Sequence, residues 1–182
     1  MVQPISLAVK NKLSIKEMCV FSMLGTIMFL SKLIMEFLPN IHLVATLVVA
    51  YTLVYRIKAL IPLYVYVFLV GAYAGFNTWW LPYLYIWTIL WLAVMLLPKS
   101  ISPKIGMVVY PTVACLHGLL YGTLYAPIQA LTFGFGWEQT LAWIGAGLYF
   151  DLIHGIGNLV LGFLIYPLTR LLTKLSREIN II

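Results

Sequence analysis

The stretch PNIHLVATLVVAYTLVYRIKALIPLYVYVFLVGAYAGF, residues 39 to 76, consists of two long apolar runs separated by a short basic segment that contains Arg56 and Lys58. Apolar runs on this scale predict helices in a lipid bilayer, where about 20 residues cross the hydrocarbon. The whole chain has the same character, since 63% of its 182 residues are hydrophobic and only 9% are charged. Soluble domains contain only about 45–50% apolar residues. The composition therefore predicts an integral membrane protein.

Six apolar runs can be drawn along the chain, and we interpret each of them as one transmembrane helix. No polar, serine-rich or repetitive segment is long enough to form a linker or a soluble module, so residues 1–182 are predicted to form a single domain. The predicted fold class is an all-α membrane protein with six transmembrane helices. One span needs roughly 20 residues. The six runs cover residues 17–38, 40–56, 59–77, 80–98, 106–133 and 140–167.

The distribution of basic residues predicts the orientation of these helices. Ten of the 11 Lys and Arg residues fall in segments that six spans place on one side, and basic loops normally lie in the cytoplasm. Both termini are therefore expected to be cytoplasmic, and Lys32 alone falls near the outer face. The net charge of +6 follows from this orientation, because no soluble basic face for nucleic acid is predicted. The ten residues are Lys10, Lys12, Lys16, Arg56, Lys58, Lys99, Lys104, Arg170, Lys174 and Arg177.

Tryptophan residues are concentrated toward the predicted outer ends of the helices. Five of the six lie there, whereas the inner ends carry mainly tyrosine. An aromatic belt is one explanation, although belts normally occupy both membrane interfaces. The other is an outward-opening pocket, because aromatic rings offer apolar contact together with a polar tip that orients a ligand. The residues expected to line this part of the pocket are Asn77, Trp79, Trp80, Tyr83 and Trp87.

Polar residues recur on one face of each of the last two predicted helices. In CLHGLLYGTLYAPIQAL, residues 115–131, a spacing of four places four of them in one row. We expect this row to face a second row in the helix over 140–167 and to form the polar floor of the pocket. The alternative is a structural clamp in which Asp151 pairs with His117 or His154. The candidate site residues are His117, Tyr121, Tyr125, Gln129, Trp143, Asp151, His154 and Asn158.

Glycine pairs and one proline are interpreted as structural features of these helices. Gly71 with Gly75, and Gly118 with Gly122, have the spacing that lets membrane helices approach closely. Pro127 lacks a backbone N–H, so we expect it to interrupt the hydrogen bonding of its helix.

The loop between the first two predicted helices carries the third polar cluster. In SKLIMEFLPNIHL, residues 31–43, Lys32 and Glu36 are four positions apart, and Asn40 and His42 follow. One interpretation of the two charges is an ion pair at the membrane interface, with a snorkelling lysine. The other is a loop whose polar residues close over a ligand. Asn40 and His42 are expected to belong to the binding site.

Motifs for catalysis or metal binding were not found in the sequence. It has no HExxH, no GxSxG and no glycine-rich phosphate loop with a lysine, so the chain is not expected to hydrolyse ATP. Cys19 and Cys115 are interpreted as packed thiols. We predict no catalytic residue, metal or cofactor, and keep as an alternative an intramembrane enzyme that uses His117, Asp151 and His154.

The stretch over residues 39–76, together with YPTVACLHGLLYGTLYAPIQAL (110–131) and DLIHGIGN (151–158), resembles the substrate-binding S components of energy-coupling factor transporters. The likeness extends from about residue 17 to residue 173. It implies a multi-pass protein of the cell membrane that captures a vitamin from outside. The implied partners are a transmembrane coupling protein and two cytoplasmic ATPases, which complete an ABC-type importer. The chain is similar to the S component proposed for cobalamin, with pantothenate and a queuosine precursor as alternative ligands.

The resemblance also implies a docking face on the first helix. In the family this helix often carries an Ala-xxx-Ala pair that contacts the coupling protein. Here the matching positions hold Ser22 and Thr26, with Gly25 beside them. These residues are small enough for close helix contact, so docking through Ser22, Gly25 and Thr26 is the expectation.

Overall fold

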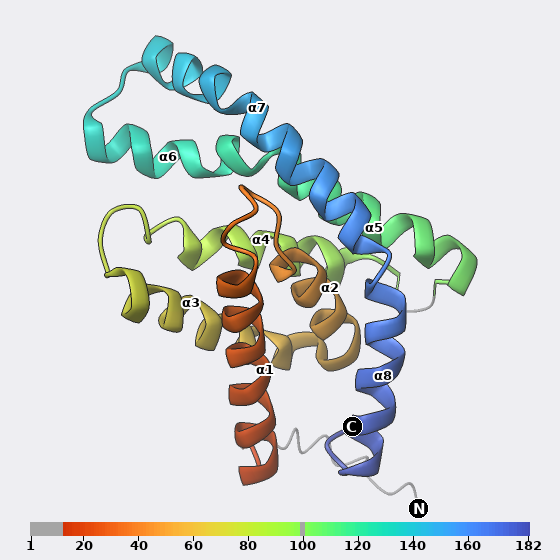
Figure 1. Cartoon of the computed structure of the whole chain (residues 1–182). Helices are drawn as coiled ribbons and strands as arrows, with labels where there is room; N and C mark the ends of the chain where they lie inside the picture. The colour runs from red at the N-terminus through yellow and green to blue at the C-terminus, as the bar shows by residue number, and fades with distance from the viewer. Residues whose placement is uncertain (1–12, 99–100) are drawn as a thin grey trace, which may run out of the picture.

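A computed structural model describes residues 13–98 and 101–182, and within these ranges the fold is all-helical without a β-strand (Figure 1). The predicted all-α fold class is thereby confirmed. The elements are α1 (Ile15–Ile34), α2 (Val44–Tyr55), the 3-10 helix η1 (Arg56–Ala59), α3 (Leu60–Ala74), α4 (Tyr83–Leu96), α5 (Pro103–Leu119), α6 (Tyr121–Phe133), α7 (Trp137–Gly162) and α8 (Ile165–Glu178).

Four helical stretches are long and apolar enough to cross a membrane, which is compatible with a membrane location. The apolar helix α4 has only 14 residues, fewer than the roughly 20 that a straight crossing needs. Each of the six runs predicted to be a transmembrane helix is at least partly helical. By length and composition, however, only four helical stretches of the described chain are candidates for crossing a membrane. The four stretches are Ile15–Ile34, Val44–Ala74, Pro103–Phe133 and Trp137–Gly162.

The stretch Val44–Ala74 changes direction at Arg56, as Figure 1 shows for α2 and α3. Arg56 has a φ of 53° and a ψ of −120°, a conformation that residues other than glycine rarely adopt. Two hydrogen bonds to α4 hold it. The indole Nε1 of Trp91 donates to the Arg56 carbonyl (3.0 Å), and the guanidinium Nη2 of Arg56 donates to the carbonyl of Met95 (3.2 Å).

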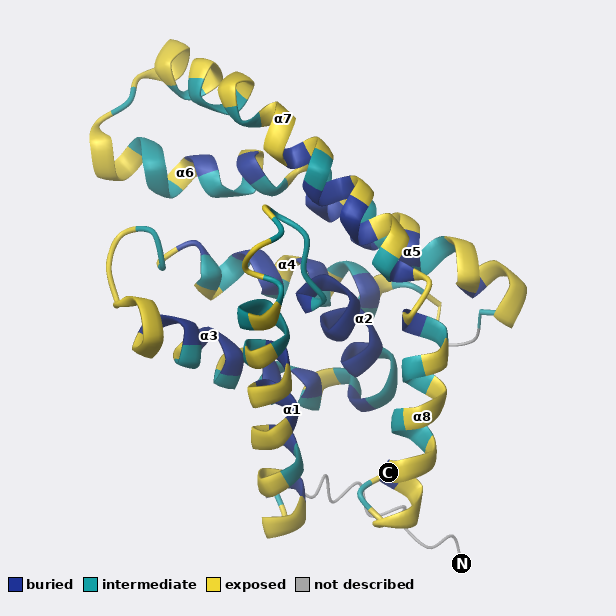
Figure 2. Ribbon diagram, in the orientation of Figure 1, coloured by how far each residue is buried: buried dark blue, intermediate teal, exposed yellow. Residues whose placement is uncertain are grey.

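α2 forms the centre of the bundle, and residues 44–52 are all buried (Figure 2). A helix that is apolar on every side needs neighbours on every side, and α1, α4, α5, α7 and α8 pack around it. The Tyr51 hydroxyl donates to the Leu24 carbonyl in α1 (3.2 Å), and the Tyr55 hydroxyl is hydrogen-bonded to Ser176 in α8 (2.8 Å). The contacts with α2 therefore determine the positions of the surrounding helices.

The helix pair α5 and α7 packs most extensively. Gly118 of α5 lies so close to Gly155 of α7 that a Cβ on Gly118 would be 2.9 Å from the Gly155 backbone. Gly118 thus has the packing role that its spacing predicted. Gly75 has a different role, because it ends α3 with a φ of 96°, a conformation that favours glycine.

The apolar run predicted as one helix over 106–133 is divided at Leu120 into α5 and α6. The Gly122 N–H donates to Asp151 Oδ1 of α7 at 2.9 Å, whereas in a continuous helix it would donate to the carbonyl four residues earlier. A carboxylate that accepts an N–H in the first helical turn acts as a cap and interacts favourably with the helix dipole. The division therefore lies at the start of α6, while α6 continues through Pro127.

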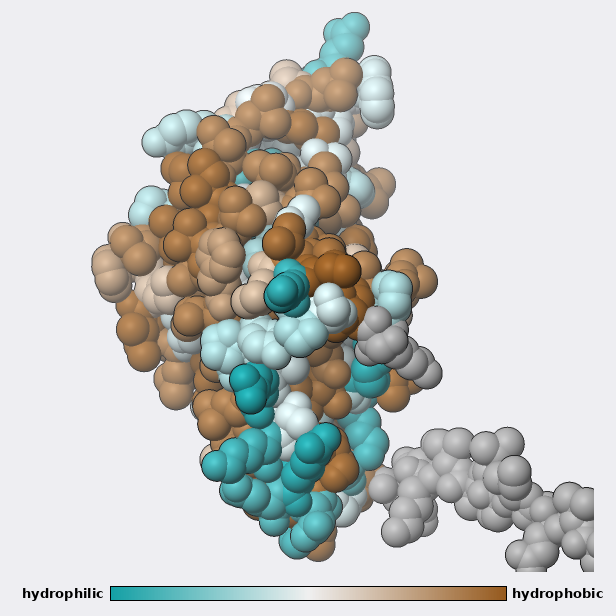
Figure 3. Space-filling model, turned by 90° about the vertical axis from the view of Figure 1, so that its right-hand side faces the viewer, coloured by the Kyte–Doolittle hydropathy of each residue, from teal (hydrophilic) through white to brown (hydrophobic). Residues whose placement is uncertain are grey.

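α8 is separate from α7, so the run predicted over 140–167 ends as a helix at Gly162. Ile165 and Ser176 are buried on the side of α8 that packs against α2. Figure 3 shows hydrophilic residues gathered at the lower end of the molecule, where α8 ends, and mainly hydrophobic residues over the rest of that face. The exposed charged residues of α8 are Arg170, Lys174, Arg177 and Glu178.

Candidate ligand-binding site

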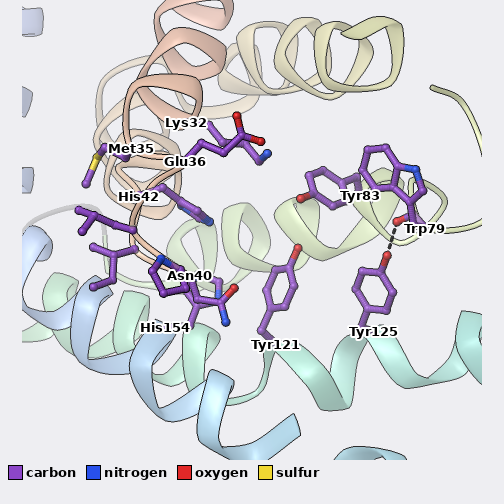
Figure 4. Close-up of a pocket in the computed structure, with 13 residues that line it drawn as sticks. Lys32, Met35, Glu36, Asn40, His42, Trp79, Tyr83, Tyr121, Tyr125 and His154 are labelled. Carbon is purple, nitrogen blue, oxygen red and sulfur yellow. Dashed lines mark hydrogen bonds between the residues drawn. The ribbon is translucent and has the colours of Figure 1, made fainter. Parts of the chain in front are cut away.

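A cavity of about 270 Å³ lies between the loop that follows α1 and the helices α4, α6 and α7 (Figure 4). The end of α1 and the loop form one side, and aromatic residues of α4 and α6 form the other. The lining residues predicted from the sequence are Asn40, His42, Trp79, Tyr83, Tyr121, Tyr125 and His154. The lining residues that were not among the predicted ones are Lys32, Met35, Glu36, Leu38, Pro39 and Ile41.

The loop over residues 35–43 folds toward α7 through Asn40. This residue has a φ of 58°, a left-handed conformation that asparagine tolerates better than most residues. Its side-chain Nδ2 donates to the carbonyl of Phe150 in α7 at 3.4 Å. The ring of His42 then lies against the ring of His154, with the two centroids 5.1 Å apart. The loop and α7 are therefore in contact through Asn40 and through His42.

Aromatic side chains form the wall opposite the loop. Figure 4 shows the hydroxyl groups of Tyr83 and Tyr121 directed toward each other at the cavity. The Tyr125 hydroxyl donates to the carbonyl of Trp79, which ties α6 to the turn before α4. Trp143 stacks on Tyr125, with ring centroids 6.2 Å apart and planes inclined by 23°. The wall therefore offers apolar ring faces and two hydroxyl groups to a ligand.

Two histidines lining the cavity have ring nitrogens without hydrogen-bond partners. His42 Nδ1 and His154 Nε2 are both buried and unpaired among the residues that the structure describes. Burial, and next the positive charge of Lys32, lowers the pKa of His42 from 6.5 to about 4, so this ring is neutral at pH 7. A neutral imidazole has one N–H donor and one acceptor. Because unpaired buried groups cost free energy, a ligand that hydrogen-bonds to them is stabilised.

Trp87 and His117 lie beneath the cavity and support its lining. The Trp87 side chain is 0% exposed, and its ring centroid lies 5.9 Å from that of His42 and 5.8 Å from that of Tyr121. His117 stacks beside Trp87 at 5.5 Å, and its Nε2 is hydrogen-bonded to the carbonyl of Ile86 at 3.0 Å. These two predicted site residues therefore do not line the cavity but pack against residues that do.

Asp151 and Asn158 lie where α7 meets α5 and α6. Asp151 accepts from the Gly122 N–H, and Asn158 Nδ2 donates to the carbonyl of Ala114 in α5 at 3.1 Å. No hydrogen bond joins Asp151 to a histidine within residues 13–98 and 101–182. The Asp151–histidine pair suggested as a clamp is thus not formed there, and α7 is instead bonded to backbone groups of α5 and α6. Of the polar residues Asp151, His154 and Asn158, only His154 lines the cavity.

The remaining predicted binding residues order the surroundings of the cavity. Asn77 Oδ1 accepts from the Trp79 N–H at 3.2 Å, and Trp80 Nε1 donates to the carbonyl of Val67 at 2.8 Å. Both bonds stabilise the turn before α4. Gln129 is half-buried farther along α6 and does not line the cavity.

The three residues proposed for docking on α1 point in different directions. Ser22 and Thr26 are exposed, and the Thr26 hydroxyl donates to the Ser22 carbonyl at 2.9 Å. Gly25 is buried against α3, where an added Cβ would lie 2.6 Å from the side chain of Val65. Gly25 therefore packs within this chain, and only Ser22 and Thr26 lie on the exposed face of α1.

Lys32 and Glu36 are the charged residues of the cavity lining. The sequence offered an ion pair as one interpretation of their spacing, but no ion pair joins them in the described part of the chain. The reason is that α1 ends at Ile34, so Glu36 is outside the helix. Neither residue was predicted to line the site, although their position next to the loop expected to close over a ligand was a signal for it.

The chemistry available in the cavity is that of a binding site for a small polar molecule. Charged, hydroxyl, amide and imidazole groups converge on one space with aromatic walls. Within the described residues, no group of three His, Cys, Asp or Glu residues is placed to hold a metal ion. In comparisons with known proteins, no family model, no curated protein and no solved structure matches the chain.

Proposed function

We propose that the chain is a multi-pass protein of the cell membrane that captures a small molecule from outside, as the S component of an energy-coupling factor transporter. The observation that carries this proposal is the cavity beneath the 35–43 loop, where polar groups from α1, α4, α6 and α7 converge. A few converging polar groups in an aromatic pocket are what sites for small ligands have in common. The resemblance of the sequence to S components supports transport as the purpose of binding.

The size of the cavity favours a small ligand. Its volume of about 270 Å³ is close to the lower end of the roughly 300–1,000 Å³ that small-molecule sites occupy. Pantothenate or a queuosine precursor is of suitable size. Cobalamin is several times larger than the cavity, so its binding would require the 35–43 loop to move away. Within the proposed transporter family, the geometry thus favours the smaller vitamins.

The proposed partners are a transmembrane coupling protein and two cytoplasmic ATPases. The exposed face of α1 with Ser22 and Thr26 is the proposed contact with the coupling protein, because small residues allow helices to approach closely. Gly25 is not part of this proposal, since Val65 already occupies its space.

Binding and uptake are the tests of the proposed function. We expect the purified chain to carry a small molecule, identified by native mass spectrometry. Cells should accumulate that molecule only when the chain is coexpressed with the coupling protein and active ATPases. Tyr125→Ala should weaken binding by about 1–3 kcal/mol, because an aromatic wall contact is lost, and calorimetry on the purified protein measures this.

Tyr149→Ala is the matched control for Tyr125→Ala, since the Tyr149 side chain is 68% exposed and is not part of the cavity lining. Equal affinity of the Tyr125→Ala variant and the unmodified chain would place the binding site elsewhere. Uptake that needs no ATPase would contradict the transporter assignment.

The second candidate function, an intramembrane enzyme that uses His117, Asp151 and His154, has less support. The hydrogen bonds of His117 and Asp151 go to backbone groups of this chain. An enzyme would convert its substrate without ATP, and His154→Ala would abolish the conversion. Such a reaction by the purified chain would favour this alternative.

The proposed orientation has both termini in the cytoplasm. An ion pair between Lys58 and Glu17 joins η1 to the start of α1, and the Tyr55–Ser176 hydrogen bond joins the end of α2 to α8. Segments that were predicted to be cytoplasmic therefore lie together. Three other basic residues used in that prediction lie outside the described residues, namely Lys10, Lys12 and Lys99.

Cysteine labelling in intact cells tests this orientation. In a chain with Cys19 and Cys115 replaced by serine, Ser102→Cys should resist a membrane-impermeant thiol reagent, whereas Gly136→Cys should react. Both positions are exposed, so the difference reports the side of the membrane. Both cysteines should react after permeabilisation, and the reverse pattern in intact cells would invert the topology.

A further inference from the structure

Two opposite charges enter the cavity from the same side. Lys32 lies in the last turn of α1 and is half-buried, and Glu36 lies in the loop that follows. Figure 4 shows both side chains extending into the space above the tyrosines. Among the residues that the structure describes, no other Lys, Arg, Asp or Glu lines the cavity. The charges that a ligand meets are therefore these two.

No ion pair joins half-buried Lys32 or exposed Glu36 to the other or to a third residue of the described chain. The ion pairs in that part of the chain join Lys58 to Glu17 and Lys174 to Glu178. The second pair has the same residue types and the same spacing as Lys32 and Glu36, but both of its members lie in α8. Glu36 instead follows the end of α1, where its N–H donates to the Leu33 carbonyl in a turn. The end of the helix thus leaves two charges available to a ligand.

The sign of each charge limits which ligands are complementary. A ligand with only a negative group gains from Lys32 but places that group near the carboxylate of Glu36. A ligand with only a positive group meets the opposite conflict with Lys32, and a neutral ligand gains from neither charge. A zwitterion is the one class that can satisfy both residues together.

The rest of the cavity suits a flat ring. The hydroxyl groups of Tyr83 and Tyr121 and the unpaired nitrogens of His42 and His154 surround a space walled by aromatic faces. His154 is 3% exposed, so its Nε2 is directed at a buried site and not at solvent. Aromatic faces pack well against another ring, and the hydrogen-bonding groups can meet polar atoms at its edge.

We propose that the cavity binds a small zwitterion with an aromatic body, of the size of an aromatic amino acid. Its anionic group is bound by Lys32, its cationic group by Glu36, and its ring lies among Tyr83, Tyr121 and the two histidines. This assignment rests on the proposed capture of a small molecule and names its chemical class, which replaces pantothenate, an anion without a ring, as the favoured ligand.

Three probes that share a phenylethyl group test the proposal by calorimetry on the full-length chain in detergent. L-phenylalanine carries both charges, 2-phenylethylamine only the positive one, and 3-phenylpropanoate only the negative one. We expect phenylalanine to bind roughly tenfold or more tightly than either single-charge probe, as expected for one additional charged contact. Lys32→Gln should abolish the advantage of phenylalanine over phenylethylamine, and Glu36→Gln its advantage over phenylpropanoate.

Lys174→Gln and Glu178→Gln are matched controls, because they remove the same residue types at the same spacing on the exposed face of α8. They should leave all three affinities unchanged. Equal binding of the three probes, or equal effects of Lys32→Gln and Glu36→Gln on all of them, would overturn the zwitterion assignment. The assignment would also be overturned if phenylalanine failed to bind and native mass spectrometry found a neutral or singly charged ligand. The proposed function would stand in that case. A chain that binds no small molecule at all contradicts both proposals.

Discussion

Trp87→Ala is expected to destabilise the protein by about 3 kcal/mol or more and to abolish ligand binding, because it removes the buried floor of the cavity. The Trp87 side chain is 0% exposed. In a membrane, this side chain stabilises the fold through packing contacts, since lipid tails are as apolar as the protein interior. The rings that would lose their contact are those of His42, Tyr66, Tyr83, His117 and Tyr121.

The loss of stability is measured by unfolding of the purified variant in detergent, and the loss of binding by calorimetry. Trp137→Ala is the matched control, since the Trp137 side chain is 76% exposed and should be replaceable at little cost. Trp87→Phe should have an intermediate effect, because it keeps an aromatic ring and removes an indole N–H that has no hydrogen-bond partner in the described part of the chain. A Trp87→Ala variant as stable as the Trp137→Ala variant would show that these rings do not pack as described.

Gly118→Val should separate α5 from α7 and cost about 1–3 kcal/mol or more, the range for overpacking a filled interior. The added Cβ would lie 2.9 Å from the Gly155 backbone and 2.8 Å from Asn158 Nδ2. A flexible side chain could move away, but backbone moves only if the helix moves. Because α7 also carries His154, ligand affinity should fall together with stability.

Gly147→Val in α7 provides the control for Gly118→Val. It introduces the same β-branched residue into a helix, at a position where an added Cβ meets nothing within 4 Å. Unfolding in detergent should therefore show a large effect at Gly118 and a small one at Gly147. Similar losses at both positions would mean that helix propensity, and not the contact between α5 and α7, determines the cost.

The parts of the fold that follow from local pattern could be predicted from the sequence. Long apolar runs become helices because only intrahelical hydrogen bonds satisfy the backbone in such surroundings. The spacing of four between Tyr121 and Tyr125 correctly placed both on one face of a helix, and both line the cavity. The polar residues before α2 signalled a loop with a special role, and Asn40 and His42 lie against α7.

Features decided by contacts between distant residues could not be predicted in this way. The division at Leu120 depends on Asp151, which accepts a hydrogen bond from the backbone N–H of Gly122, 29 positions earlier in the chain. The spacing of Asp151, His154 and Asn158 places all three on one face of a helix. Which of them lines the cavity depends on how the neighbouring helices pack against that face. Lys32 and Glu36 were paired by assuming that the helix continues, whereas it ends between them.

The stacking of Trp143 on Tyr125 gives the protein an internal optical reporter. Tyr125 is also hydrogen-bonded to the carbonyl of Trp79, so a ligand that displaces this tyrosine changes the surroundings of two indole rings. Indole emission depends on the polarity and contacts of the ring. Phenylalanine and its two analogues do not absorb where tryptophan is excited. Occupancy of the cavity can therefore be followed by intrinsic fluorescence in the unmodified chain, without any attached dye.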